Sequence, residues 1–379
     1  MARVRFGDVV KEIKINIDRA TDNHEFYIAG EHMETENIHL TKRGRFEGSD
    51  VGPAFIRLFR PGQVLYGSRR TYLKKVAVAD FEGITSNTTF VLETKDQSVM
   101  MQELLPFIML TDSFTEYAIR NSKGSTNPYI LFSDLCAYEF ELPAIEKQHI
   151  LATRLLACDN VKEAYKRLLT ATDELVKSQF VEMFGENKAG CRYLKLEDCC
   201  TKITGGKTPS MSHPEFYGGD IPFIKSGDVK ESTVSKGVLW LTEEAITKGG
   251  ASLLPKDSII VVIRSAALRH EFHVAVTEVP VVINQDLKAF QPKPEFMPIY
   301  LQWAIMSHES SLLGKVQTVL TSHIEMSDLL SIPVMVADLE QQQAFCDFKQ
   351  QADKSKFAAQ QALADLTATQ KALMRQYLG

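Results

Sequence analysis

The sequence predicts an α+β fold in which two globular domains of mixed α and β structure alternate with two long helices. Two stretches, residues 146–184 and 338–378, contain neither glycine nor proline, although the 379-residue chain holds 21 Gly and 14 Pro. The segments ahead of these stretches repeat the same features in the same order. Both segments also hold short apolar runs between turn residues, which are typical of strands. We therefore expect four parts: globular domains at 1–143 and 186–335, and helices at 144–185 and 336–379.

The two globular segments repeat several features at nearly constant offsets. Ser68 and Asn87 are separated by the same interval as Ser265 and Asn284. Gly124 and Gly314 likewise stand at equal distances ahead of Pro143 and Pro333. Alternating and apolar runs predict strands at 64–66, 76–78, 89–92, 258–263 and 279–283, and helices at 102–119 and 297–313.

The two long helices occupy equivalent places in this repeat. Glu146-Lys147-Gln148 precedes Gly185 by the same interval by which Glu340-Gln341-Gln342 precedes Gly379. A glycine directly after the last apolar residue is a common helix stop. Each helix of this length is roughly 60 Å long and needs a packing partner.

The second helix carries a coiled-coil pattern. Phe345, Ala352, Ala359, Leu366 and Leu373 recur every seven residues, and the second seam position is predicted at Phe348, Ser355, Ala362 and Thr369. The simplest partner is the first helix of the same chain. We expect an intramolecular antiparallel coiled coil that makes the molecule a pseudo-dimer with an approximate two-fold axis.

Composition narrows the function classes. The chain is 44% hydrophobic and 24% charged, as in ordinary folded proteins, and its formal charge is −5. No apolar run reaches the ~20 residues of a membrane span, and the first residues lack the apolar core of a signal peptide. The six cysteines form no CxxC pair, so no zinc site is expected. These features predict a cytoplasmic protein without a bound metal.

Signatures of catalysis are missing. Gly205-Gly206-Lys207-Thr208 resembles the end of a phosphate-binding P-loop, but the required first glycine is replaced by Thr201. Asn127-Pro128-Tyr129 is one proline short of the Asn-Pro-Pro-Tyr loop of amino-methyltransferases. No spacing pairs a nucleophile with a base. We therefore expect a chain that is not an enzyme.

Basic side chains cluster in the first segment. Arg57, Arg60, Arg69, Arg70, Lys74 and Lys75 occur without an intervening acidic residue, and the second segment has a more dilute set. Basic residues neutralise phosphates, and arginine also binds guanine edges in the major groove. Polar loops at 123–127 and 315–318 supply further donors and acceptors. The alternative interpretation is a solvated face with ordinary turns. The predicted DNA-binding residues are Arg43, Arg45, Arg57, Arg69, Arg70, Tyr72, Lys74, Lys123, Thr126, Asn127, Lys207, Thr208, Lys225, Arg264, Arg269, His270, Lys315, Gln317 and Thr318.

The whole layout resembles the specificity subunit of type I restriction-modification enzymes. In the second half the resemblance lies in Gly205-Gly206-Lys207-Thr208-Pro209, in the run from Tyr217 to Ile224, in Asn284-Gln285, and in Ile332-Pro333 ahead of Glu340-Gln341. The first half keeps Phe6-Gly7-Asp8, Ser86-Asn87, the Gly124 loop and Leu142-Pro143 ahead of Glu146-Lys147-Gln148. It lacks the Gly-Gly-Lys-Thr-Pro segment.

This resemblance implies a non-catalytic, sequence-specific DNA-binding subunit of a bacterial or archaeal cell. Each globular part is then a target-recognition domain for one part of a bipartite site in double-stranded DNA, and the helices set the spacing. Two modification subunits perform methylation, and restriction subunits add translocation and cleavage. S-adenosylmethionine, ATP and Mg are expected on these partner subunits, and no cofactor is expected on this chain.

Two alternatives stay open on the sequence alone. The first is a DNA methyltransferase or nuclease with built-in recognition domains, which predicts binding of S-adenosylmethionine by the isolated chain. The second is a coiled-coil scaffold that joins two proteins and never contacts DNA. It predicts the absence of salt-dependent DNA affinity.

Overall fold

The computed structural model describes residues 2–18, 21, 23–47, 51–186, 188–318 and 322–379, without the side chains of Gln317 and Thr318. The chain forms two compact units. The first comprises Met1–Arg167 and Ala359–Gly379, and the second comprises Leu168–Ala358. Each unit therefore contains one globular part and about half of each long helix. Within the described residues, no helix combines the length and apolar character needed to cross a membrane.

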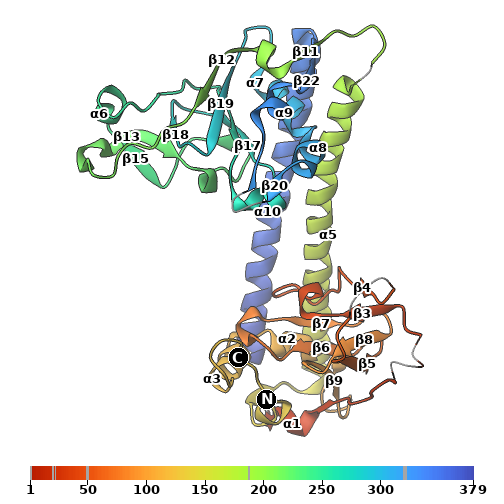
Figure 1. Cartoon of the computed structure of the whole chain (residues 1–379). Coiled ribbons are helices and arrows are strands. Elements are labelled where there is room, and N and C mark those ends of the chain that lie inside the picture. The colour runs from red at the N-terminus through yellow and green to blue at the C-terminus, as the bar shows by residue number, and fades with distance from the viewer. Residues whose placement is uncertain (1, 19–20, 22, 48–50, 187, 319–321) are drawn as a thin grey trace. The chain divides into compact units, whose positions relative to one another are not determined.

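The first unit is built on two four-stranded sheets (Figure 1). One sheet is antiparallel with the order β2-β9-β6-β7, and the other has the order β4-β3-β8-β5, with β3 and β8 parallel. A separate pair, β1 with β10, lies next to the start of the first long helix in sequence. The elements are β1 (Ala2–Arg5), α1 (Phe6–Val9), β2 (Val10–Glu12), β3 (Phe26–Ile28), β4 (Gly44–Arg45), β5 (Phe55–Phe59), β6 (Val64–Gly67), β7 (Val76–Val78), β8 (Gly83–Ser86), β9 (Thr89–Thr94), α2 (Leu105–Met109), α3 (Asp112–Arg120), α4 (Phe132–Leu135) and β10 (Glu139–Leu142), followed by α5 (Ile145–Phe184) up to Arg167 and α10 (Leu339–Leu378) from Ala359.

The second unit repeats this topology. Its main sheet has the order β12-β19-β16-β17-β14, its second sheet has the order β15-β13-β18 with β13 and β18 parallel, and β11 pairs with β22. The elements are β11 (Tyr193–Lys195), β12 (Cys200–Gly205), β13 (Tyr217–Ile224), β14 (Thr233–Val234), β15 (Leu239–Leu241), α6 (Glu243–Thr247), β16 (Ile259–Val262), β17 (Val274–Thr277), β18 (Val282–Ile283), β19 (Leu287–Pro292), α7 (Pro298–Met306), α8 (Glu309–Gly314), β20 (Gln317–Thr318), β21 (Ser322–His323), α9 (Met326–Leu330) and β22 (Pro333–Met335), with the remaining parts of α5 and α10. The mixed α/β class and the internal repeat are confirmed.

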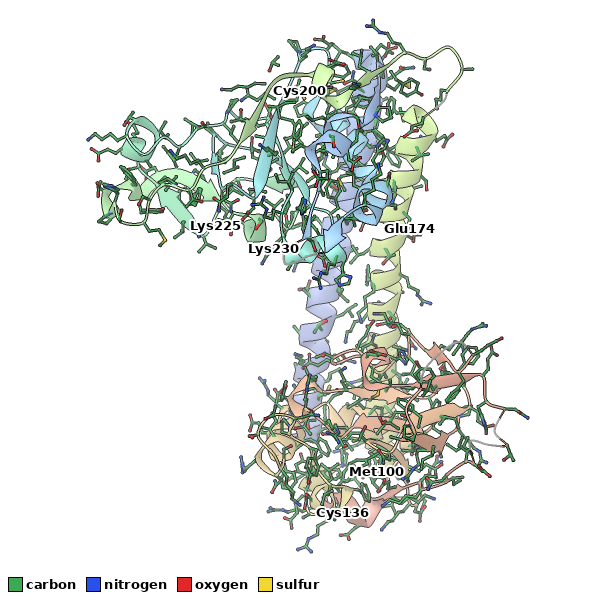
Figure 2. The ribbon with its side chains drawn as sticks, viewed as in Figure 1. Met100, Cys136, Glu174, Cys200, Lys225 and Lys230 are labelled. Carbon is green, nitrogen blue, oxygen red and sulfur yellow. The ribbon has the colours of Figure 1, made fainter. Side chains whose placement is uncertain are left out.

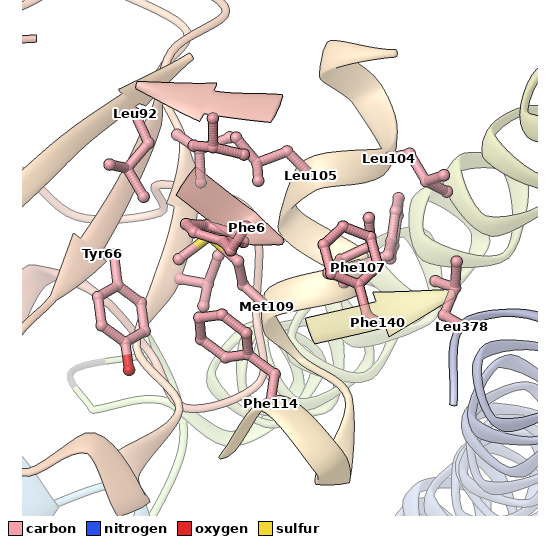
Figure 3. Close-up of a cluster of buried hydrophobic side chains, with 14 of the residues drawn as sticks. Phe6, Tyr66, Leu92, Leu104, Leu105, Phe107, Met109, Phe114, Phe140 and Leu378 are labelled. Carbon is pink, nitrogen blue, oxygen red and sulfur yellow. The ribbon is translucent and has the colours of Figure 1, made fainter. Parts of the chain in front are cut away.

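Each unit has a core that joins its main sheet to its helices. In the first, Phe6, Phe107 and Phe114 are fully buried and lie close to Phe140 and to Leu378 of α10 (Figure 3). In the second, Phe180 of α5 packs against Phe345 of α10, with ring centroids 5.0 Å apart. Burial of each such side chain contributes about 1.5–3 kcal/mol. These contacts therefore stabilise the packing of the α5 and α10 segments in each unit against the core of that unit.

Both units pair α5 with α10 in opposite directions. In the first unit Lys162 of α5 donates to Gln370 of α10 over 2.7 Å. In the second, the later part of α5 lies against the earlier part of α10, where Asp173 forms an ion pair with Lys356. The predicted antiparallel pairing within one chain is therefore confirmed for each unit. The approximate two-fold axis that relates the two units stays a prediction.

Part of the second seam position of α10 lies one residue later than predicted. Ser355 and Thr369 are exposed, whereas Lys349 and Gln370 are buried and Lys356 is half-buried. The predicted first position holds, because Phe345 and Ala359 are buried. The prediction holds in part at Phe348 and Ala362, which are half-buried. It was wrong at Ser355 and Thr369, because the long polar side chains of the next residues occupy the seam there and resemble surface residues in a sequence pattern.

Three other expectations differ from the structure. The helix predicted at 102–119 is broken, because Thr111 is extended and its side chain caps α3 by accepting from the amide of Phe114. The helix predicted at 297–313 is likewise divided into α7 and α8. Strand β18 covers only Val282–Ile283 of the run predicted at 279–283.

Candidate nucleic-acid interface

In the first unit, two loops distant in sequence form one surface at the end of β6. The amide of Arg70 donates to the carbonyl of Pro128 over 2.7 Å, and the amide of Ile130 donates to the carbonyl of Ser68 over 3.0 Å. Between these two bonds, Arg69 lies directly opposite Tyr129 in an antiparallel bridge. The loop after β6 and the loop between α3 and α4 are thus held side by side. We call residues 68–72 and 123–130 the first loop pair.

Several predicted DNA-binding residues meet on the first loop pair. Arg69, Arg70, Thr126 and Asn127 are exposed, and Tyr72 is 53% exposed. The guanidinium of Arg70 donates to Oδ1 of Asn127 over 3.3 Å. Arg69 makes no ion pair with any residue that the structure describes. This surface therefore offers an uncommitted guanidinium beside polar and aromatic groups.

The backbone beneath these side chains is strained. Arg70 has φ 51° and Lys74 has φ 46°, so both non-glycine residues are in the left-handed region. Such conformations cost roughly 1–3 kcal/mol each and are found most often at functional sites. The strain marks residues 70–74 as a segment whose shape is imposed by its surroundings.

The other predicted residues of the first unit are engaged within the protein. Arg57 is mostly buried against Glu12 and the carbonyl of Ile13, while Arg45 pairs with Glu25 over 3.2 Å. Arg43 lies over the ring of Phe26, with 4.2 Å from its Cζ to the centroid. Part of the basic cluster seen in the sequence is therefore paired within the fold and is not available to a ligand.

Lys74 is also committed, to two carboxylates. Its Nζ lies 2.9 Å from both Glu36 and Asp112. Burial alone would lower the pKa of Lys74, but the hydrogen bonds with Asp112 and Glu36 outweigh it and raise the pKa. Lys74 therefore remains charged and holds the loop after β6 in place.

The second unit repeats the arrangement at the end of β16. The amide of Ser265 donates to the carbonyl of Ser322 over 3.2 Å, and the amide of Ile324 donates to the carbonyl of Ile263 over 2.9 Å. Arg264 lies opposite His323 in the antiparallel bridge between them. We call residues 263–270 and 322–324 the second loop pair. Arg264 is exposed and, like Arg69, has no ion-pair partner in the described part of the chain.

The surroundings of the two loop pairs also correspond. Lys123 pairs with Asp134 and Lys315 pairs with Asp328, each over 2.9 Å. Arg269 donates to Oγ of Ser322 over 3.4 Å, and His270 is exposed. Gln317 and Thr318 form β20, but their side chains lie outside the described part of the structure.

These hydrogen bonds correct the register of the internal repeat. Arg69 corresponds to Arg264 and Arg70 to Ser265, so the sequence pairing of Ser68 with Ser265 is wrong by two residues. Pro333 likewise begins β22, which corresponds to β10, and is not the counterpart of Pro143. The two repeats differ by short insertions, so a constant offset in the sequence can pair the wrong residues. The backbone hydrogen bonds identify which residues of the two units are equivalent.

The glycine-rich motif of the second unit lies at the same end of the main sheet. The amide of Lys207 donates to the carbonyl of Ile283 over 3.1 Å, and Thr208 donates to Oε1 of Gln285 over 2.6 Å. A Cβ at Gly206 would overlap the carbonyl oxygen of Asn284, so only glycine permits this approach.

This motif is continuous with the second loop pair. The carbonyl of Asp286 accepts from the amides of Ile263 and Arg264, over 2.9 and 3.3 Å. The amide of Asn284 donates to the carbonyl of Ile224, the last residue of β13, so the exposed Lys225 that follows β13 lies beside the Asn284 segment (Figure 2). Lys207, Thr208, Lys225 and Arg264 therefore flank one connected polar edge.

Three residues of these surfaces were missed by sequence reasoning as binding residues: Tyr129, His323 and Gln285. Tyr129 is 40% exposed opposite Arg69, and His323 is opposite Arg264. Only the pairing of distant loops reveals Tyr129 and His323. Gln285 had a sequence signal, since it belongs to the Asn-Gln motif.

Other reactive groups do not gather at these edges. Burial raises the pKa of the Cys199 and Cys200 thiols to about 12, which keeps them protonated near neutral pH. Among the described residues, no group of three or more His, Cys, Asp or Glu side chains is arranged to hold a metal ion. The chemistry available at the loop pairs is hydrogen bonding and charge, which suits recognition of a polyanion with polar edges.

Parts of the chain are similar to known proteins. Residues 190–365 match the model of the type I restriction modification DNA specificity domain. The Escherichia coli EcoR124I/EcoR124II specificity subunit is 32% identical over 145 residues, which cover 38% of this chain and 36% of that protein. The MjaIX specificity subunit of Methanocaldococcus jannaschii is 30% identical over 105 residues, covering 27% of this chain and 23% of that protein. The matches thus span about a third or less of these curated relatives.

Solved structures extend the likeness to the whole fold. A chain from a study of complex assembly and conformational transition of the type I R-M system has a TM-score of 0.59 at 18% identity, covering 99% of this chain and 97% of that chain. The S subunit of a type I restriction-modification system from M. genitalium has a TM-score of 0.57 at 13% identity, covering 100% and 96%. The resemblance seen in the sequence is confirmed to this extent: residues 190–365 match the model of the type I restriction modification DNA specificity domain, and the chain as a whole shares its fold with the S subunit from M. genitalium.

Proposed function

We propose that this chain is the DNA sequence-specificity subunit of a type I restriction-modification system. One observation carries the proposal: both units present an unpaired arginine at the same place in the same loop pair, among the residues that the structure describes. A protein that reads two separate short sequences needs two such surfaces, similar in construction and different in detail. Arg69 and Arg264, with Lys207, Lys225 and the polar loops around them, supply phosphate and base contacts.

The activities of the system belong to other subunits in this proposal. Two modification subunits bind S-adenosylmethionine and methylate the DNA, and restriction subunits use ATP and Mg for translocation and cleavage. The chain directs them to a bipartite site and acts in the cytoplasm. Its paired helices α5 and α10 offer the surface for assembly with the modification subunits.

The test is a methylation map of a host genome. The chain is expressed with its modification subunits in a host that lacks the restriction subunit, so that altered sites are not cut. We expect one motif with two short defined parts and an undefined spacer. A continuous motif, or no motif that depends on this chain, would contradict the proposal.

DNA binding by the purified complex provides a second readout. The affinity should fall steeply with salt, because binding releases counterions from the phosphates. A chain that is only a scaffold should leave the DNA affinity of the modification subunits unchanged. Binding of S-adenosylmethionine by the isolated chain would instead indicate a methyltransferase.

A further inference from the structure

The two loop pairs place one arginine at an equivalent position in each unit. Arg69 follows β6 and Arg264 follows β16, and each is flanked by two backbone hydrogen bonds of 2.7–3.2 Å to the partner loop. The residues on either side differ: Arg70 corresponds to Ser265, and Tyr129 corresponds to His323. The arginine is the side chain that the two surfaces share.

The other basic groups near this position have partners within the fold. Lys123 and Lys315 pair with Asp134 and Asp328, while Arg70 and Arg269 donate to the neutral side chains of Asn127 and Ser322. Arg69 and Arg264 have no such partner among the described residues. In each unit, this arginine therefore has a guanidinium with neither an ion pair nor a hydrogen bond to the described residues.

The backbone at this position is fixed on both sides. Besides the partner loop, a third segment contributes: the amide and hydroxyl of Ser68 both donate to the carbonyl of Thr88. In the second unit, the carbonyl of Asp286 accepts from Ile263 and Arg264. An arginine that must present two donors in one plane benefits from a fixed backbone, because its side chain then loses less orientational freedom on binding.

We infer that Arg69 and Arg264 are equivalent base-reading residues, each of which specifies a guanine in its own half-site. This inference rests on the proposed function. The two parallel donors of the guanidinium match O6 and N7 of guanine in the major groove. A phosphate, by contrast, is bound nearly as well by lysine as by arginine, so a phosphate contact would not need this geometry. Tyr129 lies directly opposite Arg69, and His323 lies directly opposite Arg264, so each is on the same face of its loop pair as the arginine. The guanine in each half-site would therefore have a different side chain beside it.

The test uses methylation maps of single variants in the host without the restriction subunit. In the Arg69→Ala complex, preference for one guanine in one half-site should fall roughly 10- to 100-fold, with the other half-site and the spacer unchanged. In the Arg264→Ala complex, a guanine of the opposite half-site should relax. Arg69→Lys and Arg264→Lys should relax the same positions, because lysine keeps the charge and loses the fork.

Matched controls lie at the opposite ends of the same strands. Arg60 precedes β6 and Lys256 precedes β16, so Arg60→Ala and Lys256→Ala remove a charge without touching the loop pairs. Both control maps should equal that of the wild type. Thermal unfolding of each complex identifies variants that do not fold. If an alanine variant does not fold, the lysine variant at the same position provides the test.

Two outcomes overturn the inference. The first is an unchanged motif in the arginine variants. The second is a uniform loss of methylation at an unchanged motif with a smaller salt slope, as expected for a phosphate contact. Both leave the wild-type bipartite motif in place. A wild-type map without such a motif instead contradicts the proposed function itself.

Discussion

Gln148 makes the same three backbone hydrogen bonds in the first unit that Gln342 makes in the second. Oε1 of Gln148 accepts from the amide of Met101 over 3.0 Å, and Nε2 donates to Val99 and Pro143 over 2.9 Å each. Gln342 accepts from Met297 over 2.8 Å and donates over 2.9 Å to the carbonyls of Glu295 and Ala337. Both side chains are fully buried. Each glutamine thus fastens the first turn of a long helix to its own globular part.

This relationship predicts a large loss of stability when either amide is removed. Gln148→Ala leaves the carbonyl of Pro143, whose bond to Gln148 is buried, and the part-buried amide of Met101 without their partner, and a buried unpaired group costs about 1–3 kcal/mol. Urea unfolding should therefore show at least that loss, and Gln342→Ala should show a similar one. Gln341→Ala is the matched control, because Gln341 is exposed on the same helix turn. If both variants lose no more than an ordinary surface substitution, which stays within about 0.5 kcal/mol, this role is contradicted.

The contact between His39 and Asp159 predicts that the free energy of unfolding of the first unit depends on pH. Nε2 of His39 lies 2.7 Å from Oδ2 of Asp159 on α5. The adjacent carboxylate of Asp159 raises the pKa of His39 against the effect of burial. Burial alone would raise the pKa of Asp159, but His39 and Lys162 outweigh it and lower that pKa.

The sign of the effect follows from these directions. Because the pKa of folded His39 is raised, its contribution is complete below the unfolded value of 6.5 and is lost as the pH rises through the folded pKa. Asp159 contributes above its unfolded pKa and loses this contribution as the pH falls through its folded pKa. His39 is partly exposed, so the expected term is a few tenths to about 1 kcal/mol. Urea unfolding between about pH 6 and pH 8 should show a decline in the wild type that His39→Gln removes; an equal decline in both would rule the pair out.

The seam between α5 and α10 shows why the helix pairing could be predicted and its details could not. Breaker-free stretches of similar length and the repeat of Phe345 and Ala359 suffice to predict two long paired helices. The second seam position is filled by Lys356 and Gln370, which no apolar pattern selects. Their burial depends on partners such as Asp173 and Lys162, which belong to the other long helix and lie far away in the sequence.

The candidate site shows the same division. Arg69 and Arg57 look alike in the sequence, as members of one basic run. The fold buries Arg57 against Glu12 and leaves Arg69 exposed. Which charge stays free depends on the acidic residues that neighbouring strands bring near, and this cannot be inferred from spacing along the chain.

Lys162 and Gln370 predict a measurable coupling across the helix pair of the first unit. Both are buried, and Gln370 also lies 3.4 Å from Asp159. Gln370→Leu should destabilise by about 1–3 kcal/mol, because it leaves the ammonium of Lys162 with fewer acceptors. Adding Lys162→Leu should recover part of this loss, since it removes the ammonium that lacks acceptors, while His39 remains beside the buried carboxylate of Asp159. A double-mutant cycle by urea unfolding measures the coupling, which we expect at about 0.5–2 kcal/mol; strictly additive losses would show that the contact is incidental.

Gly206 predicts a selective effect on the second half-site. A Cβ at this position would overlap the carbonyl oxygens of Asn284 and Ile283, so Gly206→Ala must displace the segment that carries Lys207 and Thr208. The displacement breaks the hydrogen bond from Thr208 to Gln285, at the edge that continues into the second loop pair.

Under the proposed function, Gly206→Ala should relax or abolish recognition of one half-site while the other half-site keeps its sequence. The matched control is Gly227→Ala, because a Cβ at Gly227 meets no atom within 4 Å. Both variants are compared by methylation mapping, and thermal unfolding of the complexes checks that the second unit remains folded. If Gly206→Ala folds and leaves both half-sites intact, the glycine-rich segment plays no part in reading DNA. Loss at the same half-site that Arg264→Ala alters would instead place the glycine-rich segment and the second loop pair on one recognition surface.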